Sequence, residues 1–186
     1  MNIRPLFPTP IACIPNCITS KERLQLIKSI KNINHSSHDA ISGDGLSSHR
    51  KDGQSSISLD RGIKKRIQTV LDEYNTECGN KLSKLDNVWS NIQNSGSKLL
   101  EHSHPDCCIS GALYINVGEE SRIYFHNPNP YVYSTFRRES TPYNYEYNWI
   151  PVHNCELILF PSWLRHGGGE YINEMDERIV LSFNTK

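Results

Sequence analysis

Three histidines have the spacing of a metal site. His102 and His104 are separated by a single residue, and His166 lies far downstream at the start of a glycine-rich turn. In an extended strand, residues i and i+2 point to the same face, so both imidazoles of the pair can reach one ion. Two close ligands and one distant ligand cover one face of a metal and leave other positions open. The sequence therefore predicts a mononuclear metal site with room for further ligands.

Arg178 is a charged residue inside an apolar stretch that reads as a strand. Its side chain points either to solvent, where it would form a cross-strand ion pair, or into the fold. In the second case its planar guanidinium could bind a carboxylate through two parallel hydrogen bonds. The pattern leaves both interpretations open.

The N-terminal part of the chain predicts an edge strand and two helices. Prolines in residues 1–16 exclude a helix and favour an extended edge strand. Ser20 is the expected N-cap of a helix that continues to about Ile33. Residues 35–56 are rich in Ser, Gly, Asp and His, which is typical of a long loop. A second apolar stripe at helical spacing predicts a helix over about 59–82.

The C-terminal part predicts a series of short strands, because several segments alternate apolar with polar residues, one is rich in tyrosine and one is a short apolar run. The expected strands are 88–92, 109–117, 122–125, 143–150, 157–160 and 178–183. Helices followed by a run of strands indicate an α+β protein with a jelly roll or sandwich as its strand half. We expect one domain over residues 1–186, with a helical annex at about 18–84 and a β-barrel core at about 86–186.

Composition limits the classes of partner. The chain has 186 residues, with 20 basic and 20 acidic side chains and a formal net charge of zero, so a nucleic-acid partner is not expected. Its six cysteines form no C-x-x-C pair, and no apolar signal segment is found, which favours a reduced, cytoplasmic setting. No stretch approaches the ~20 apolar residues of a membrane span.

Several motifs in order resemble those of 2-oxoglutarate/Fe(II)-dependent oxygenases of bacteria and phages, within the prolyl-hydroxylase-like superfamily. The motifs lie at residues 6–11 (LFPTPI), 89–91 (WSN), 96–105 (GSKLLEHSHP), 109–114 (ISGALY), 159–166 (LFPSWLRH) and 178–184 (RIVLSFN). The resemblance covers most of the chain and is weakest at about 35–58. It implies a double-stranded β-helix, the cupin-like jelly-roll barrel, with two supporting N-terminal helices.

The same resemblance implies cofactors and residue roles. Fe(II) and the cosubstrates 2-oxoglutarate and O2 are expected, and Arg178 should bind the far carboxylate of 2-oxoglutarate with help from Ser182. Asn91 and Tyr114 should lie on strands that line the cosubstrate pocket. Asn91 could equally be a strand-end cap, and Tyr114 could be an ordinary core residue.

The ligand set departs from the superfamily pattern at one position. His102 corresponds to the first ligand histidine, and His104 stands where a carboxylate is usual. A frame shifted by two would instead pair His104 with Asp106. We favour His102, His104 and His166 as ligands. Asp106 is either an alternative ligand or an acceptor of a hydrogen bond from one of the ligand histidines.

The predicted activity is that of an oxidoreductase that couples decarboxylation of 2-oxoglutarate to oxidation of a substrate whose identity the sequence does not reveal. One alternative is a cupin-like dioxygenase with three histidines that uses no 2-oxoglutarate. Another is a non-catalytic jelly roll that acts as a binding or virion-associated module. The setting would be the host cytoplasm if the gene is carried by a phage, and a homodimer is the commonest assembly for such a chain.

Overall fold

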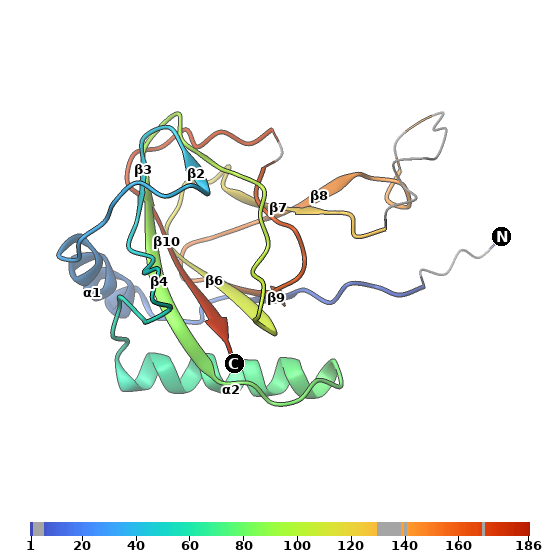
Figure 1. Cartoon of the computed structure of the whole chain (residues 1–186), viewed down its shortest axis with the longest axis horizontal. Helices are drawn as coiled ribbons and strands as arrows, with labels where there is room; N and C mark the ends of the chain where they lie inside the picture. Colours follow the sequence, from blue (N-terminus) through green and yellow to red (C-terminus); the bar gives the residue numbers. More distant parts are fainter. Residues whose placement is uncertain (2–5, 130–138, 140, 169) are drawn as a thin grey trace.

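The computed structural model describes the chain except for residues 2–5, 130–138, 140 and 169 (Figure 1). The elements run in the order β1 (Ala12–Ile14), α1 (Ser20–Lys31), β2 (Ile41–Ser42), β3 (Gly45–Ser47), α2 (Arg61–Glu77), β4 (Leu85–Gln93), β5 (Lys98–Leu99), β6 (Ile109–Asn116), β7 (Arg122–His126), β8 (Tyr147–Pro151), β9 (Leu157–Pro161) and β10 (Arg178–Thr185).

A six-stranded sheet carries most of the fold. Its strand order is β1-β9-β6-β10-β4-β3, and every neighbouring pair is antiparallel. The C-terminal strand β10 therefore lies between β4 and β6, and β6 separates it from β9, the strand that precedes it in the chain. This position places Arg178 opposite Gln93, and Ser182 opposite both Trp89 and Ala112.

Alternation along β10 gives the sheet two different faces. Ile179, Leu181 and Phe183 are fully buried in the larger hydrophobic core. Arg178, Val180, Ser182 and Asn184 line a cavity on the opposite face. Because successive side chains of a strand point to opposite faces, one strand serves both the core and the cavity.

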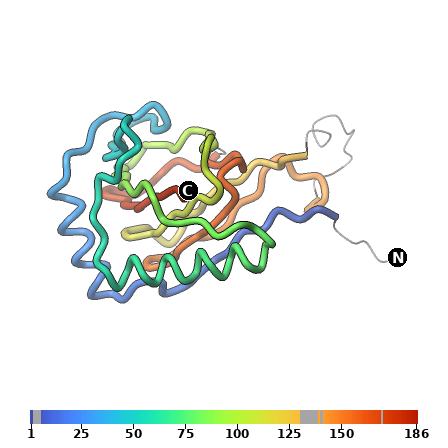
Figure 2. The backbone as a smooth tube through the Cα atoms, turned by 60° about the horizontal axis from the view of Figure 1, so that its bottom comes forward, coloured from blue at the N-terminus to red at the C-terminus, as the bar shows by residue number. Residues whose placement is uncertain are grey.

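The two helices cover the core face of the sheet. Both lie on one side of the sheet, while the β7–β8 hairpin projects at the opposite end (Figures 1 and 2). Their buried residues belong to the same core cluster as those of β10: Leu26 and Ile30 from α1, and Ile63, Ile67, Leu71 and Tyr74 from α2. The apolar stripe predicted for the second helix is this buried face.

A smaller layer closes the other side of the cavity. It consists of the pairs β2–β5 and β7–β8, together with isolated bridges that His166 makes to His102 and Phe125. A second hydrophobic cluster, which includes Ile123, Phe125 and Phe160, joins this layer to the main sheet. Two antiparallel layers with supporting helices form the predicted α+β jelly roll.

Some boundaries differ from the prediction. Thr19, one residue before the expected Ser20, caps α1, because its hydroxyl accepts from the amide of Glu22 while the Glu22 carboxylate accepts from the Thr19 amide. Helix α2 ends at Glu77 and not near residue 82, since Gly79 takes a positive φ of 67° that stops the helix.

Two other segments also differ. Residues 35–56 contain the short strands β2 and β3 and are not a plain loop. The strand expected over 143–150 begins only at Tyr147, because residues 142–144 form a turn. Among the described residues, no helix has both the length and the apolar character needed to cross a membrane.

Candidate metal centre and cosubstrate pocket

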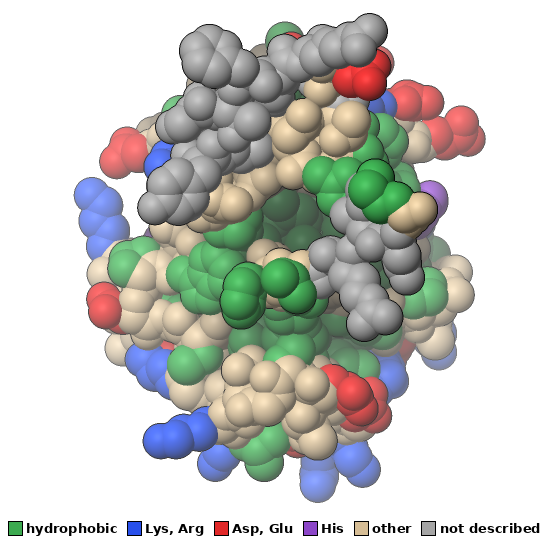
Figure 3. Space-filling view, turned by 90° about the vertical axis from the view of Figure 1, so that its right-hand side faces the viewer, with side chains coloured by type: hydrophobic (Ala, Val, Ile, Leu, Met, Phe, Trp, Pro, Cys, Tyr) green, Lys and Arg blue, Asp and Glu red, His purple; other side chains and the backbone are tan. Residues whose placement is uncertain are grey.

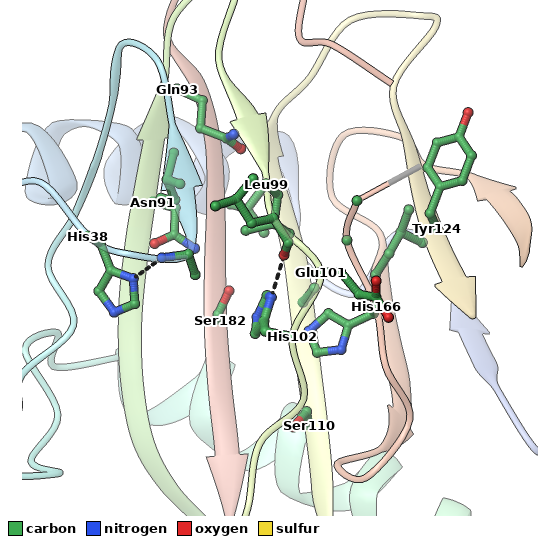
Figure 4. Close-up of a pocket in the computed structure, with 18 of the residues that line it drawn as sticks. His38, Asn91, Gln93, Leu99, Glu101, His102, Ser110, Tyr124, His166 and Ser182 are labelled. Atoms are coloured by element: carbon green, nitrogen blue, oxygen red, sulfur yellow. Dashed lines mark hydrogen bonds between the residues drawn. The ribbon is translucent and has the colours of Figure 1, made fainter. Parts of the chain in front are cut away.

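The structure brings His102, His104 and His166 to one point. One ring nitrogen of each lies within 4.8 Å of the others. The ring centroid of His102 is 4.3 Å from that of His166, and the centroid of His104 is 5.1 Å from both. Because metal–imidazole bonds are ~2.0–2.1 Å long, one ion can reach all three nitrogens. Figure 4 shows His102 and His166 facing the same space.

The histidine pair does not lie in a regular strand, contrary to the prediction. His102 makes an isolated bridge in which its amide donates to the His166 carbonyl, and the His166 amide donates back to the His102 carbonyl. The His104 amide donates to the carbonyl of Ser162, 2.9 Å away. The backbone that follows β5 is thus held against the turn that follows β9, and this pairing brings together candidate ligands that are distant in sequence.

Two of the three rings are oriented by nearby carbonyls. Nδ1 of His102 lies 2.8 Å from the Leu100 carbonyl, and Nδ1 of His166 lies 3.0 Å from the Leu164 carbonyl. A carbonyl can only accept, so each Nδ1 carries the proton and each Nε2 has a free lone pair. Such bonds fix the tautomer that a metal-binding histidine needs.

The local electrostatics keep the imidazoles neutral. Burial lowers the pKa of His104 to about 4, helped by neighbouring His102 and His49. Burial also lowers the pKa of His102 and holds that of His166 well below its usual range. Neutral imidazole is the form that binds a metal, so the three side chains are ready as ligands at neutral pH.

The alternative ligand Asp106 lies elsewhere. It occupies an exposed turn with a positive φ of 62°, and it does not line the cavity. Its carboxylate is not part of the group formed by the three imidazoles. The arrangement therefore supports the unshifted frame, in which His104 takes the usual place of the carboxylate.

A cavity of about 620 Å³ extends from the three histidines along the inner faces of β4, β6 and β10. Figure 3 shows the molecule hollowed, with mostly hydrophobic side chains around the hollow, on the face that carries the β7–β8 hairpin. The volume is within the range of small-molecule sites.

Arg178 lies deep in this cavity and lacks a full set of partners. Its exposed fraction is 7%, its Nη1 donates to Oε1 of Gln93 over 2.7 Å, and its Nε is buried without an acceptor. No ion pair among the described residues involves Arg178. A buried guanidinium with an unmet donor and no counter-ion fits a bound carboxylate. The inward orientation is thus the one observed.

The other predicted cosubstrate residues lie along the same cavity. Asn91, Tyr114 and Ser182 all line it, and Figure 4 draws Ser182 next to His102, with Asn91 beyond it. The Tyr114 ring centroid is 5.7 Å from Cζ of Arg178, and burial strongly raises the pKa of its hydroxyl. Tyr114 is therefore a neutral hydrogen-bond donor next to the guanidinium.

Sequence reasoning missed other residues of this cavity. Gln93 is two positions after Asn91, so strand alternation alone could have placed both on one face. Asn184 ends the motif that contains Arg178 and Ser182, but no role was assigned to it. His38, His49 and Trp89 also line the cavity, although the two histidines were expected only in a loop. No local sequence signal marks those two.

A jelly roll with an open set of three imidazoles and a buried arginine defines a class, the mononuclear non-haem metalloenzymes. Within that class, the sequence profile of the family described as "Putative 2OG-Fe(II) oxygenase" matches residues 87–184. The chain belongs to this family of 2-oxoglutarate- and Fe(II)-dependent oxidoreductases. No curated protein matches the sequence.

Solved structures with the same fold share little sequence with this chain. The 2OG-Fe(II) family oxidoreductase from Burkholderia pseudomallei has a TM-score of 0.64 at 12% identity, covering 95% of this chain and 85% of that one. A prolyl-4-hydroxylase from Pseudomonas putida gives 0.61 at 11%, covering 96% and 92%. HygX from Streptomyces hygroscopicus with nickel and 2-oxoglutarate bound gives 0.60 at 12%, covering 95% and 82%.

These findings confirm the predicted double-stranded β-helix, the oxygenase family, and Fe(II) with 2-oxoglutarate as its cofactors. At 11–12% identity, the solved structures bear on the fold alone.

Proposed function

We propose that His102, His104 and His166 hold Fe(II), and that Arg178 binds the carboxylate of 2-oxoglutarate that lies away from the metal. One observation carries this assignment: a buried guanidinium, with no counter-ion in the part of the chain that the structure describes, shares a cavity with three convergent, neutral imidazoles. A dicarboxylate with one end at the metal would supply the missing acceptor at Arg178.

When bound, Fe(II) and 2-oxoglutarate supply the oxidising chemistry, in which O2 oxidises a substrate while the cosubstrate loses CO2 to give succinate. The protein supplies position and a dry environment. Gln93 holds the guanidinium of Arg178 through Nη1, which leaves its other donors for the ligand. Asn91, Tyr114 and Ser182 line the path between Arg178 and the histidines and can donate hydrogen bonds to the cosubstrate.

We infer further that residues 1–186 act as one domain, since a single core cluster joins both helices to the sheet that carries the site. All six cysteines are free thiols, which supports a reducing compartment such as the cytoplasm.

The arginine variant tests the cosubstrate assignment. Arg178→Ala should weaken binding of 2-oxoglutarate to the Mn(II)-loaded protein by at least about 30-fold, because a desolvated carboxylate that loses its charged partner costs ~2 kcal/mol or more. Calorimetric titration measures this change. Arg50→Ala, which breaks an exposed ion pair with Asp52, is the matched control and should bind as the wild type does.

Two results would contradict the proposed residue roles: no binding of 2-oxoglutarate by the Mn(II)-loaded wild type, or unchanged binding by Arg178→Ala. A crystal soaked with Mn(II) and 2-oxoglutarate would show directly which residues contact the metal and which contact the far carboxylate.

A further inference from the structure

A row of four aromatic rings leads away from the candidate metal ligands. Trp89 stacks on His104, with ring centroids 5.8 Å apart and planes at 28°. His49 meets Trp89 at 5.0 Å and 79°, and His38 meets His49 at 5.3 Å and 88°. All four side chains line the cavity. The cavity therefore has a continuous aromatic wall beside the candidate metal site.

This wall lies away from the proposed carboxylate site. On β4, Gln93 pairs with Arg178, whereas Trp89 pairs with Ser182. Trp89 and Gln93 are thus ~13 Å apart along the strand, at ~3.3 Å per residue. Figure 4 shows His38 on the far side of Ser182 from His166. A 2-oxoglutarate molecule that extends from Arg178 to the metal would leave the rings of His49 and His38 uncovered.

Buried backbone contacts hold His49 at the edge of the main sheet. The Ser48 amide donates to the Ser90 carbonyl, and the Ser90 amide donates back to Oγ of Ser48, both over 2.9 Å. The His49 amide donates to Oγ of Ser47, the last residue of β3, over 3.1 Å. The ring of His49 is therefore held in place by the pairing of β3 with β4.

His38 is held against the segment that carries His102. The Leu100 amide donates to the Ala40 carbonyl over 2.8 Å, two residues from each histidine. The Ala40 amide in turn donates to Nδ1 of His38 over 3.1 Å, which is a dashed line in Figure 4. Because this Nδ1 accepts a hydrogen bond, Nε2 of His38 carries the hydrogen and is a donor.

The outer two rings of the row have unused hydrogen-bonding groups. Within the described part of the chain, neither ring nitrogen of His49 has a hydrogen-bond partner, and Nε2 of His38 has no acceptor. Burial lowers the pKa of His49, so its ring is neutral at pH 7 and offers one donor and one acceptor. Both rings are only half-buried, so a ligand in the cavity can reach them.

Trp89 is buried without being part of a hydrophobic core. Its exposed fraction is 6%, yet it belongs to neither of the two core clusters. Its ring contacts are with His104 and His49, which both line the cavity. A tryptophan in the wall of a cavity, next to polar groups without partners, is typical of a ligand site.

We propose that Trp89, His49 and His38 form the substrate subsite, and that this subsite binds a flat, uncharged aromatic ring that carries a hydrogen-bonding group. Aromatic side chains gain more from a second aromatic ring than from a saturated one. The free ring nitrogens would bind the polar group. The row contains no carboxylate, ammonium or guanidinium group, so a charged ring would lose its water without gaining an ionic partner there. This inference rests on the proposed function, because it places the substrate beside the proposed metal.

Two probes with the same carbon skeleton test the aromatic preference: 2-naphthol and its saturated counterpart decahydro-2-naphthol. Both are titrated by calorimetry into the Mn(II)-loaded protein, saturated with 2-oxoglutarate and kept free of O2. We expect 2-naphthol to bind roughly tenfold more tightly, because only the flat ring makes aromatic pairs with the wall. Mn(II) should also broaden the proton NMR signals of 2-naphthol, whereas Zn(II) in its place should not, because the probe lies close to the metal.

Variants of His49 test the named wall. His49→Leu should weaken binding of 2-naphthol by roughly fivefold and leave binding of the saturated probe unchanged. His49→Phe restores an aromatic ring and should recover most of the loss. His153→Leu, which changes an exposed histidine outside the cavity, is the matched control. Affinities for Mn(II) and 2-oxoglutarate, measured separately, show whether each variant still forms the metal centre.

Three results would each overturn the inference. They are equal binding of the two probes by the wild type, unchanged binding of 2-naphthol by His49→Leu, and binding of 2-naphthol without broadening by Mn(II). Should His49→Leu not fold, His38→Leu at the far end of the row decides by the same criterion.

The failure of this inference can be told from the failure of the proposed function. If the wild type binds no Mn(II) or no 2-oxoglutarate before a probe is added, the proposed function is wrong and the substrate subsite falls with it. If both bind but the two probes are not distinguished, the proposed function stands and only the substrate subsite is overturned.

Discussion

The chemistry at the residue scale depends on which hydrogen-bonding groups have partners and which do not. Arg178 has one acceptor in Gln93 and a buried Nε with none. The Nε2 atoms of His102 and His166 have free lone pairs because each Nδ1 is bound to a carbonyl. The unmet groups point to the ligands that the site is built to bind.

Gln93 is the residue whose replacement should affect cosubstrate binding most selectively. Gln93→Leu removes the acceptor of Arg178 Nη1, so the guanidinium loses its fixed orientation. We expect 2-oxoglutarate to bind the Mn(II)-loaded variant roughly tenfold more weakly, since hydrogen bonds to charged groups contribute ~1.5–3 kcal/mol. Gln93→Glu should lower the affinity further, because its carboxylate would neutralise Arg178 and compete with the cosubstrate.

Calorimetric titration of 2-oxoglutarate measures both variants, and Co(II) affinity serves as the internal control. Gln93 is a neighbour of Arg178 and not of the histidines, so metal affinity should stay within about twofold of the wild-type value. Equal affinity of Gln93→Glu and the wild type for 2-oxoglutarate would argue against Arg178 as the carboxylate site.

At the scale of elements, the alternation of side chains along a strand determines which residues can be assigned to one face from the sequence. Arg178 and Ser182 could be predicted as one face of a strand, and the sequence pattern also predicted the three histidines as one site. The pairing of β10 with β4 and β6 could not be predicted from local signals, because it joins segments far apart in the chain. For this reason Gln93, whose role depends on its cross-strand partner Arg178, remained unassigned.

In residues 35–56, too, strand pairing could not be predicted from the local sequence. Its composition is typical of a loop, yet β2 and β3 pair with β5 and β4 and bring His38 and His49 to the cavity. Strands of two and three residues are too short to leave a period in the sequence. Whether these two strands form depends on the strands that they pair with, β5 and β4.

The start of helix α1 gives a pH-dependent test of stability. The Arg66 guanidinium and the Thr19 cap hold the pKa of Glu22 at about 2, below its ordinary value of 4.5. A carboxyl group with a lowered pKa in the folded state stabilises the fold above pH 4.5, and this contribution is lost as the pH falls through about 2. Glu22→Gln keeps the capping geometry but removes the charge.

We therefore expect Glu22→Gln to lower the free energy of unfolding by about 1 kcal/mol at pH 7, with the difference shrinking towards zero near pH 2. Urea denaturation at a series of pH values measures it. Glu73→Gln, on the exposed face of α2, is the control. A difference that grows as the pH falls would contradict the assigned pKa shift.

At the scale of the whole molecule, the site joins the two layers of the jelly roll. The His104 amide donates a hydrogen bond to the carbonyl that directly follows β9, His166 bridges to Phe125 of β7, and Arg178 lies in the main sheet. A ligand bound among them links these parts in the folded state only. Binding should therefore stabilise the entire fold by mass action.

Mn(II) and 2-oxoglutarate, each at about 100 times its dissociation constant, should each add ~2.7 kcal/mol to the free energy of unfolding. For a protein of this size the Mn(II) contribution alone corresponds to a rise in Tm of roughly 5–10 °C, measurable by calorimetry or fluorescence. His166→Ala should abolish the Mn(II)-dependent rise. His153→Ala, which changes an exposed histidine outside the cavity, should retain it.

Strand β10 has a consequence for how the substrate range of this protein could change. A slip of one residue along β10 would move Arg178 and Asn184 into the core and expose the core residues to the cavity, so both fold and chemistry would be lost together. The register of this strand therefore cannot change stepwise without loss of the fold. New substrates would have to be accommodated by segments that border the cavity without sharing the central core, namely the β7–β8 hairpin and residues 35–56.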